Sequence, residues 1–297
     1  MDDSNKQIYS DGDEIENTLL QIFSVQKDQD KKIEELIKTG IWTYIYHLDK
    51  GRENLLNWYN FDKNASLLEI GAGCGALTGL FLRKLKNVHA LELSEMRAQI
   101  IQKRYSAYRN LTTIIANVMD HKTKERFDYV TSIGVLEYSG IYIQTENPYL
   151  TFLKKLKSFL KPNGYLIIAI ENQFGLKYWA GAYEDHTGRL FDSIEDYPNN
   201  NTGIRTFGKN SMKNLLNEAG FKDINFYYPM PDYKFPTEIY SDNYKPNFIV
   251  DLRPYTLAHG IHQDRLYFFF EERRAFDALI KENIVDLFAN SFLIFAR

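Results

Sequence analysis

The sequence predicts an α/β protein built on a doubly wound, mostly parallel sheet of seven strands. From residue 66 onward, short apolar runs alternate with segments of helical periodicity. The run GYLIIAI at 164–170 is apolar along its whole length, as a strand buried on both faces is. This alternation of strand and helix is typical of parallel sheets, because each parallel pair needs a crossover connection.

The strands and helices are predicted from the apolar runs and from the Gly and Pro residues that interrupt them. Strands are expected at 66–71, 88–94, 111–117, the start of 127–138, 164–170, 224–230 and 291–297. Helices are expected at 76–86, 95–107, 150–160 and 211–219.

Three parts are expected along the chain. Residues 1–60 form a helical N-terminal extension, because their apolar residues recur at helical spacing between Ile15 and Trp58. Residues 61–230 together with 291–297 form the α/β core. The stretches 171–208 and 231–290 lack a regular period; structureless loops of that length are uncommon, so we expect ordered insertions that form a lid.

Composition limits the class of protein. The net charge of −3 and pI of about 6.1 provide no basic field to attract nucleic acid, so no nucleic-acid partner is predicted. The single cysteine, Cys74, excludes an internal disulfide and fits a reducing compartment. No apolar run approaches the ~20 residues that span a bilayer, and the N-terminus lacks the apolar segment of a secretory signal. A cytoplasmic protein is predicted.

A glycine-rich run, EIGAGCG at 69–75, joins the first predicted strand to the following helix. Glycines let the backbone approach a ligand closely, and the helix N-terminus offers free N–H groups to an anion. Glu92 lies on the next strand, 21 residues after Gly71. At this spacing a carboxylate accepts both ribose hydroxyls of an adenosine. These features fit a nicotinamide-binding domain equally well, because Ala76 completes its glycine pattern.

Three further features favour a methyl-transfer cofactor. Glu69 precedes the first glycine by two residues, where an acid can bind the amino group of a methionine moiety. The motifs FDYVTSIGVLEY and LKPNGYLIIAI then follow in order. This succession, across roughly residues 60–230, resembles the class I S-adenosylmethionine-dependent methyltransferases. The resemblance implies a Rossmann-like core that binds S-adenosylmethionine and releases S-adenosylhomocysteine.

The resemblance also implies cofactor contacts at four places in the core. They are Glu69, Gly71, Ala72 and Gly73 for the methionine end, Glu92 and Leu93 for the ribose, Asn117 and Val118 for the adenine, and Ile133 and Gly134 beside the reactive methyl group. Asn117 stands where the family often has an acid, and its side-chain carbonyl can accept the same hydrogen bond.

The segment YHLDKGRENLLNW at 46–58 directly precedes the first strand. We expect Arg52 to pair with the methionine carboxylate and His47 to cover it. A solvated amphipathic helix is the alternative interpretation.

Two runs, 171–188 and 228–236, follow the fifth and sixth strands. Ligands of open α/β sheets bind beyond the carboxyl ends of the strands, so these runs are predicted to bind the methyl acceptor. The predicted acceptor-binding residues are Glu171, Asn172, Lys177, Tyr178, Glu184, Asp185, Asp232, Tyr233 and Lys234. Both runs resemble a bacterial subset of these methyltransferases that is associated with surface-polysaccharide biosynthesis.

His186 is the predicted general base, because two acids precede it in the best-placed loop. A hydrogen-bonded structural histidine is the alternative. No metal site is predicted. His259 and His262, with Asp264, have a suggestive spacing, but no second cluster of ligands supports them and a loop role is favoured.

The leading functional hypothesis is an O-methyltransferase that acts on a small-molecule or carbohydrate-type hydroxyl. An N-methyltransferase for a natural-product amine is the alternative within enzymes. A cofactor-binding scaffold without catalysis is the alternative from another class.

Overall fold

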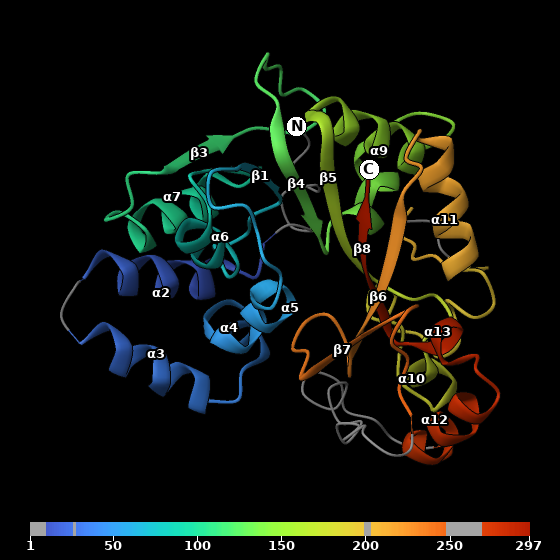
Figure 1. Ribbon diagram of the computed structural model, residues 1–297. Helices are drawn as coiled ribbons and strands as arrows, with labels where there is room; N and C mark the ends of the chain where they lie inside the picture. The colour runs from blue at the N-terminus through green and yellow to red at the C-terminus, as the bar shows by residue number, and fades with distance from the viewer. Residues whose placement is uncertain (1–9, 26–27, 199–202, 248–268) are drawn as a thin grey trace. The chain divides into compact units, whose positions relative to one another are not determined.

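The computed structural model describes residues 10–25, 28–198, 203–247 and 269–297. In these residues eight strands form one sheet in the order β3-β2-β1-β4-β5-β8-β6-β7 (Figure 1). The predicted α/β fold with a large, mostly parallel sheet is confirmed, but the predicted strand count of seven is wrong by one. The additional strand, β7 (Glu238–Ser241), pairs antiparallel with β6 (Ile224–Met230). It has only four residues, too few for a period-two pattern to be recognised in the sequence.

The chain divides into two compact units, residues 1–129 and 130–297, with the boundary inside β4 (Phe127–Ile133). In the first unit, three parallel strands lie side by side with β2 in the middle. They are β1 (Ser66–Ile70), β2 (Asn87–Glu92) and β3 (Leu111–Ile115). Helices α6 (Thr78–Lys84) and α7 (Glu95–Arg104) connect them. Ser94 caps α7 by accepting a hydrogen bond from the backbone N–H of Arg97 at 3.3 Å.

The N-terminal segment of the first unit is helical. Its elements are α2 (Asp13–Ser24), α3 (Gln29–Lys38), α4 (Trp42–Leu48), the 3-10 helix η1 (Lys50–Glu53) and α5 (Asn54–Asn57). One face of α2, including Leu19, is buried in a cluster that contains Ile100 of α7. Arg97 of α7 donates to Glu16 of α2 at 2.8 Å and to Asp11 at 2.6 Å. Apolar packing and ion pairs therefore join this segment to the strands.

The second unit is organised around β8 (Ser291–Ala296), which lies between β5 (Leu160–Glu171) and β6 and is antiparallel to both. Every residue of β8 is buried. The other elements are η2 (Leu136–Tyr138), α8 (Ser139–Tyr142), α9 (Pro148–Ser158), α10 (Leu176–Trp179), α11 (Lys209–Glu218), α12 (Glu272–Lys281) and α13 (Val285–Phe288). Helices α9 and α11 flank β5 and β6 in Figure 1.

In the described part of the first predicted insertion, 171–198 and 203–208, there is little regular structure beyond α10, yet polar contacts hold it. The Asn172 amide donates to the carbonyls of Leu287 and Ala289, both at 2.8 Å. The Gln173 amide donates to the carbonyl of Ser193 at 3.0 Å. Side-chain hydrogen bonds therefore order this segment in place of a regular backbone pattern. Its role as a lid stays a prediction.

Part of the second predicted insertion, 248–268, lies outside the described residues, and His259, His262 and Asp264 lie there. Among the described residues, no helix is both long enough and apolar enough to cross a membrane.

Replacing Leu19 by alanine tests whether the N-terminal helices belong to the folded first unit. Leu19 is fully buried, so Leu19→Ala is expected to lower the free energy of unfolding by about 2–5 kcal/mol, measured by urea denaturation. Val25→Ala, at an exposed position of the same segment, is the control and is expected to change it by less than about 0.5 kcal/mol. Equal effects of the two substitutions would show that α2 does not contribute to the core.

Candidate functional site

The turn after β1 is shaped by three glycines in left-handed conformation. The φ angles are 67° at Gly71, 56° at Gly73 and 79° at Gly75. A Cβ atom added to Gly75 would lie 2.9 Å from the ring of Tyr105, whose hydroxyl donates to the Gly75 carbonyl at 2.7 Å. A Cβ atom added to Gly73 would meet nothing within 4 Å. The turn is therefore supported at Gly75 and open at Gly73, which suits close approach of a ligand.

Glu92, the last residue of β2, lies against this turn. Its Oε2 accepts a hydrogen bond from the backbone N–H of Gly73 at 2.8 Å, and its Oε1 accepts one from Ser94 at 2.9 Å. Burial raises the pKa of Glu92, although the hydrogen bonds from Ser94 and Gly73 oppose this shift. The glycine turn and the Glu92 carboxylate, which lie 21 residues apart when counted from Gly71, are thus in direct contact in the structure. Ala72 is buried within the turn, and Leu93 is half-buried after Glu92.

Glu69 is buried near the end of β1, and its Oε2 accepts a hydrogen bond from the Thr78 hydroxyl at 2.6 Å. Burial raises the pKa of Glu69 to about 8, and the negative charge of Glu92 acts in the same direction. At pH 7 the carboxyl group is therefore mostly protonated. A positively charged amino group beside it would favour the ionised form.

The predicted contacts of Arg52 and His47 with the methionine carboxylate stay predictions. Both side chains are buried. The Arg52 guanidinium lies 4.0 Å from the centre of the Tyr46 ring. His47 Nε2 is 2.8 Å from Asp11 Oδ2, and burial lowers the pKa of His47 despite this partner.

The other predicted cofactor residues lie at strand ends. Asn117 follows β3, and its side-chain carbonyl accepts a hydrogen bond from the backbone N–H of Met119 at 2.9 Å. Val118 is half-buried beside it. In the second unit, Ile133 ends β4, and Gly134 follows with φ 68°. A Cβ atom on Gly134 would lie 2.9 Å from the Tyr233 hydroxyl, so this position excludes larger residues. The contacts of these residues with the adenine and with the reactive methyl group of the cofactor stay predictions.

Several predicted acceptor residues form a buried network of charges in the second unit. Lys234 Nζ donates to Glu171, the last residue of β5, and lies 3.5 Å from Asp185 Oδ1. Lys177 Nζ and the Tyr178 hydroxyl both donate to Asp185 Oδ2, at 2.5 and 2.6 Å. Burial favours the neutral acid, but the charges of Lys234 and His186 outweigh it and lower the pKa of Glu171. The network therefore favours the ionised form of Glu171.

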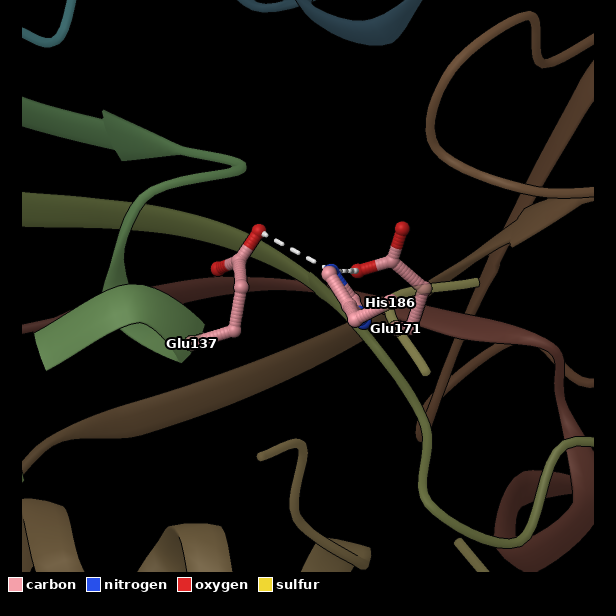
Figure 2. A group of neighbouring side chains, drawn as sticks. All are labelled: Glu137, Glu171 and His186. Carbon is pink, nitrogen blue, oxygen red and sulfur yellow. Dashed lines mark ion pairs between the residues drawn. The ribbon is translucent and has the colours of Figure 1, made fainter. Parts of the chain in front are cut away.

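The ring of His186 is held at Nδ1 and faces two acids with Nε2. Its Nδ1 lies 3.0 Å from Glu184 Oε1, and Glu184 Oε2 accepts hydrogen bonds from the backbone N–H groups of His186 and Thr187 at 2.8 and 2.7 Å. Its Nε2 lies 3.9 Å from Glu137 Oε1 and 4.0 Å from Glu171 Oε2. Figure 2 shows the imidazole between the two carboxyl groups.

The surroundings of His186 control its protonation. Burial alone would lower the pKa of the ring, but the nearby carboxylates of Glu137, Glu184 and Glu171 raise it well above its ordinary value. This shift favours the positively charged form of the ring in the free protein.

Glu137 was not predicted from the sequence. It lies in η2, four residues after the end of β4, and is 1% exposed. Burial raises its pKa, and the charge of Glu171 adds to the shift, while His186 opposes it. Its position in FDYVTSIGVLEY, as an acid just beyond a buried strand, is the signal that could have indicated it.

Other predicted acceptor residues make structural contacts. Both N–H groups of the Asn172 amide are used by backbone carbonyls. Asp232 accepts a hydrogen bond from the backbone N–H of Lys234 at 2.8 Å. The backbone N–H of Tyr233 donates to the Ser291 hydroxyl at 2.8 Å. These bonds shape the loops, and direct contact with an acceptor stays a prediction.

Comparison with known proteins identifies the family. A family model described as a methyltransferase domain matches residues 43–225, more than half of the chain. The chain belongs to this methyltransferase-domain family, and its cofactor is S-adenosylmethionine. The open side of the turn at Gly73, with Glu92 against it, fits that cofactor.

Individual relatives are distant. The chain is 27% identical over 77 residues to ribosomal RNA small subunit methyltransferase A of Fusobacterium nucleatum. This match covers 26% of this chain and 29% of that protein. It is 28% identical over 107 residues to probable (S)-tetrahydroprotoberberine N-methyltransferase 2 of Papaver bracteatum. This match covers 35% of this chain and 28% of that protein. The matches thus span less than a third of these relatives' own length. The solved structure of an S-adenosylmethionine-dependent methyltransferase of Thermotoga maritima is 15% identical in sequence to this chain, with a TM-score of 0.49. The superposition covers 94% of this chain and 98% of that one.

Replacing Glu92 by alanine tests the ribose contact. Glu92→Ala is expected to weaken S-adenosylhomocysteine binding more than tenfold in isothermal titration, because charge-assisted hydrogen bonds contribute about 1.5–3 kcal/mol. Glu95→Ala, at the exposed first residue of α7, is the matched control and should bind normally. Wild-type affinity in a folded Glu92→Ala protein would remove Glu92 from the site.

The raised pKa of Glu69 predicts that cofactor binding is linked to proton release. If the amino group of S-adenosylhomocysteine lies beside Glu69, its charge lowers the pKa of about 8, and a proton leaves at pH 7. The affinity should therefore rise between pH 6 and pH 8. Titrations at pH 7 in buffers of different ionisation enthalpy measure the proton count. Glu69→Gln should abolish the release; a release that persists in this variant would assign it to another group.

Proposed function

We propose that this protein transfers the methyl group of S-adenosylmethionine to a hydroxyl group of a small-molecule or carbohydrate-type acceptor. The observation that carries the proposal is the cluster that His186 forms with two buried acids, Glu137 and Glu171. Glu171 ends β5, and Glu137 lies just beyond the end of β4. In open α/β sheets, ligands bind beyond these carboxyl ends. The cluster therefore offers proton-accepting groups on the side where an acceptor is expected.

Methyl transfer to a hydroxyl needs alignment and removal of a proton. The cofactor supplies an activated methyl group and a sulfur leaving group. This chain's residues must position the acceptor oxygen and take its proton as the new carbon–oxygen bond forms. His186 is the proposed base. Glu184 sets the orientation of its ring, and Glu137 and Glu171 stabilise the positive charge that the ring gains.

The same carboxylates keep the His186 ring protonated in the free protein. The ring must lose that proton before it can accept one from the acceptor. The charged groups beyond it, Lys177, Asp185 and Lys234, are proposed to hydrogen-bond the other hydroxyls of the acceptor. A carbohydrate offers several such hydroxyls, which favours a role in polysaccharide biosynthesis.

A second candidate, N-methylation of an amine, is favoured by one observation. Three carboxylates, Glu137, Glu171 and Glu184, surround the ring of His186. Such a concentration of negative charge attracts a cationic amine. The same charge and the net charge of −3 disfavour a nucleic-acid acceptor. A small-molecule or glycan acceptor and a cytoplasmic location accordingly stay part of this proposal.

A panel of acceptors tests the class of substrate. The protein is incubated with S-adenosylmethionine labelled in the methyl group and with monosaccharides, phenols, amines or ribosomal RNA. Label on the oxygen of a hydroxyl compound is the expected result. Label on amines alone would favour the second candidate, and label on RNA alone would contradict the proposal.

Two substitutions of His186 separate catalysis from support of the loop. His186→Ala is expected to lower kcat at least a hundredfold while S-adenosylhomocysteine still binds, since general-base help contributes about 10²–10⁴ in rate. His186→Asn places an amide where the hydrogen bond to Glu184 can be kept, but it cannot act as a base, so it should be equally slow. Recovery of activity in His186→Asn would show that His186 has a structural role instead.

A further inference from the structure

We propose that Glu137, Glu171 and His186 bind a divalent transition-metal ion such as Mn²⁺ or Zn²⁺. The sequence predicted no metal site, and the three residues lie 34 and 15 positions apart along the chain. The proposed role of the ion, activation of the acceptor hydroxyl, rests on the proposed function. Binding of the ion does not.

The geometry of the three donors fits a single ion. One ligand atom from each residue lies within 4.8 Å of the others. The two distances to His186 Nε2 are 3.9 Å from Glu137 and 4.0 Å from Glu171. These separations are too long for hydrogen bonds. A centre shared by three such atoms lies roughly 2.0–2.5 Å from each, the range of bonds from metal ions to nitrogen and oxygen.

Each of the two carboxylates has one oxygen that no group of the described residues satisfies. Among the described residues, Glu171 Oε2, the atom that faces His186, is buried and has no hydrogen-bond partner. Glu137 Oε2 is also buried without a hydrogen-bond partner, while the Glu137 atom nearest His186 is Oε1. Both residues are 1% exposed. Buried carboxylate oxygens without partners are costly, and coordination of a cation is one of the ways in which proteins satisfy them.

His186 is held as metal-binding histidines are held. Its Nδ1 contacts Glu184, which leaves Nε2 directed at the two carboxylates. Glu184 is itself fixed by the backbone N–H groups of His186 and Thr187. A carboxylate behind the imidazole sets the ring orientation and increases its strength as a ligand.

The local charge favours a cation. Among the described residues, the charged groups that face the ring are Glu137, Glu171 and Glu184. Lys234 pairs with Glu171 through Oε1, the oxygen that does not face the ring. One lysine therefore leaves an excess of negative charge around Nε2. An imidazole together with carboxylates suits Mn²⁺ or Zn²⁺, whereas Mg²⁺ and Ca²⁺ prefer oxygen ligands throughout.

An ion at this position gives the proposed reaction a second way to activate the acceptor. A hydroxyl bound to a divalent cation has a lowered pKa and gives up its proton to water more readily. His186 would then be a ligand of the ion and not the base.

Titration of the metal-free full chain with Mn²⁺, followed by electron paramagnetic resonance, tests the site without an activity assay. One Mn²⁺ per wild-type chain is expected. Glu137→Gln should bind it at least about tenfold more weakly, because one charged ligand is lost. Glu146→Gln, an exposed carboxylate of the same unit, is the matched control and should bind as the wild type does. S-adenosylhomocysteine binding verifies that each variant is folded, and His186→Asn provides a second test if Glu137→Gln is not.

Absence of bound Mn²⁺ and of bound Zn²⁺ in the wild type would overturn the proposal, as would equal binding by wild type and Glu137→Gln. The two proposals can fail separately. If methyl transfer to a hydroxyl continues at full rate in EDTA, the role of the metal fails and the proposed function stands. If the ion binds but only amines are methylated, the metal site stands and the proposed function fails.

Discussion

Charge compensation in the buried region after β4 and β5 is the constraint on which the second unit depends. Glu137, Glu171 and Glu184 lie there together with Lys177 and Lys234, and each is 8% exposed or less. A buried charge without a partner costs several kcal/mol, so the loops must supply counter-charges at fixed positions. The contacts of Lys234 with Glu171 and of Lys177 with Asp185 meet this requirement. They bring together segments distant in sequence, and so they order a region with little regular secondary structure.

Compensation is incomplete around His186, which is consistent with the proposed role of this cluster. The lysines neutralise Glu171 on one side and Asp185 on the other. Glu137 has no such partner among the described residues except the imidazole, 3.9 Å away. The remaining negative charge is available to a proton, a metal ion or an acceptor. Perturbed acids of this kind cluster at catalytic sites more often than elsewhere.

In the first unit, backbone geometry shapes the glycine turn. The absence of a side chain at Gly75 leaves room for the ring of Tyr105. At Gly73 no atom lies within 4 Å of the position that a Cβ atom would take. Glu92 and Glu69 are buried acids whose pKa values are raised. Both positions can therefore respond to a ligand, Glu92 through hydrogen bonds and Glu69 through charge.

A feature of this structure could be predicted from the sequence where the residues that define it lie close together along the chain. The buried strands and the glycine turn were predicted because their patterns are local, and the family match supports the cofactor they indicated. Strand β7 was missed because its four residues carry no period. His186 was singled out by its acidic neighbours in sequence, whereas its partnership with Glu137 joins residues 49 positions apart and leaves no local pattern. The Asn172 amide donates to the carbonyls of Leu287 and Ala289, a link that only the tertiary structure can show, and its contact with an acceptor stays a prediction.

The central claim is that Glu137 and His186 act as one unit in activating the acceptor. A double-mutant cycle of Glu137→Gln and His186→Asn, measured as kcat/KM for a hydroxyl acceptor, tests it most directly. If the two residues act together, whether through a shared proton or a shared ion, the double variant should be no more than a few-fold slower than the slower single variant. Fold-losses that multiply in the double variant would show that the two side chains act independently, and would contradict the account.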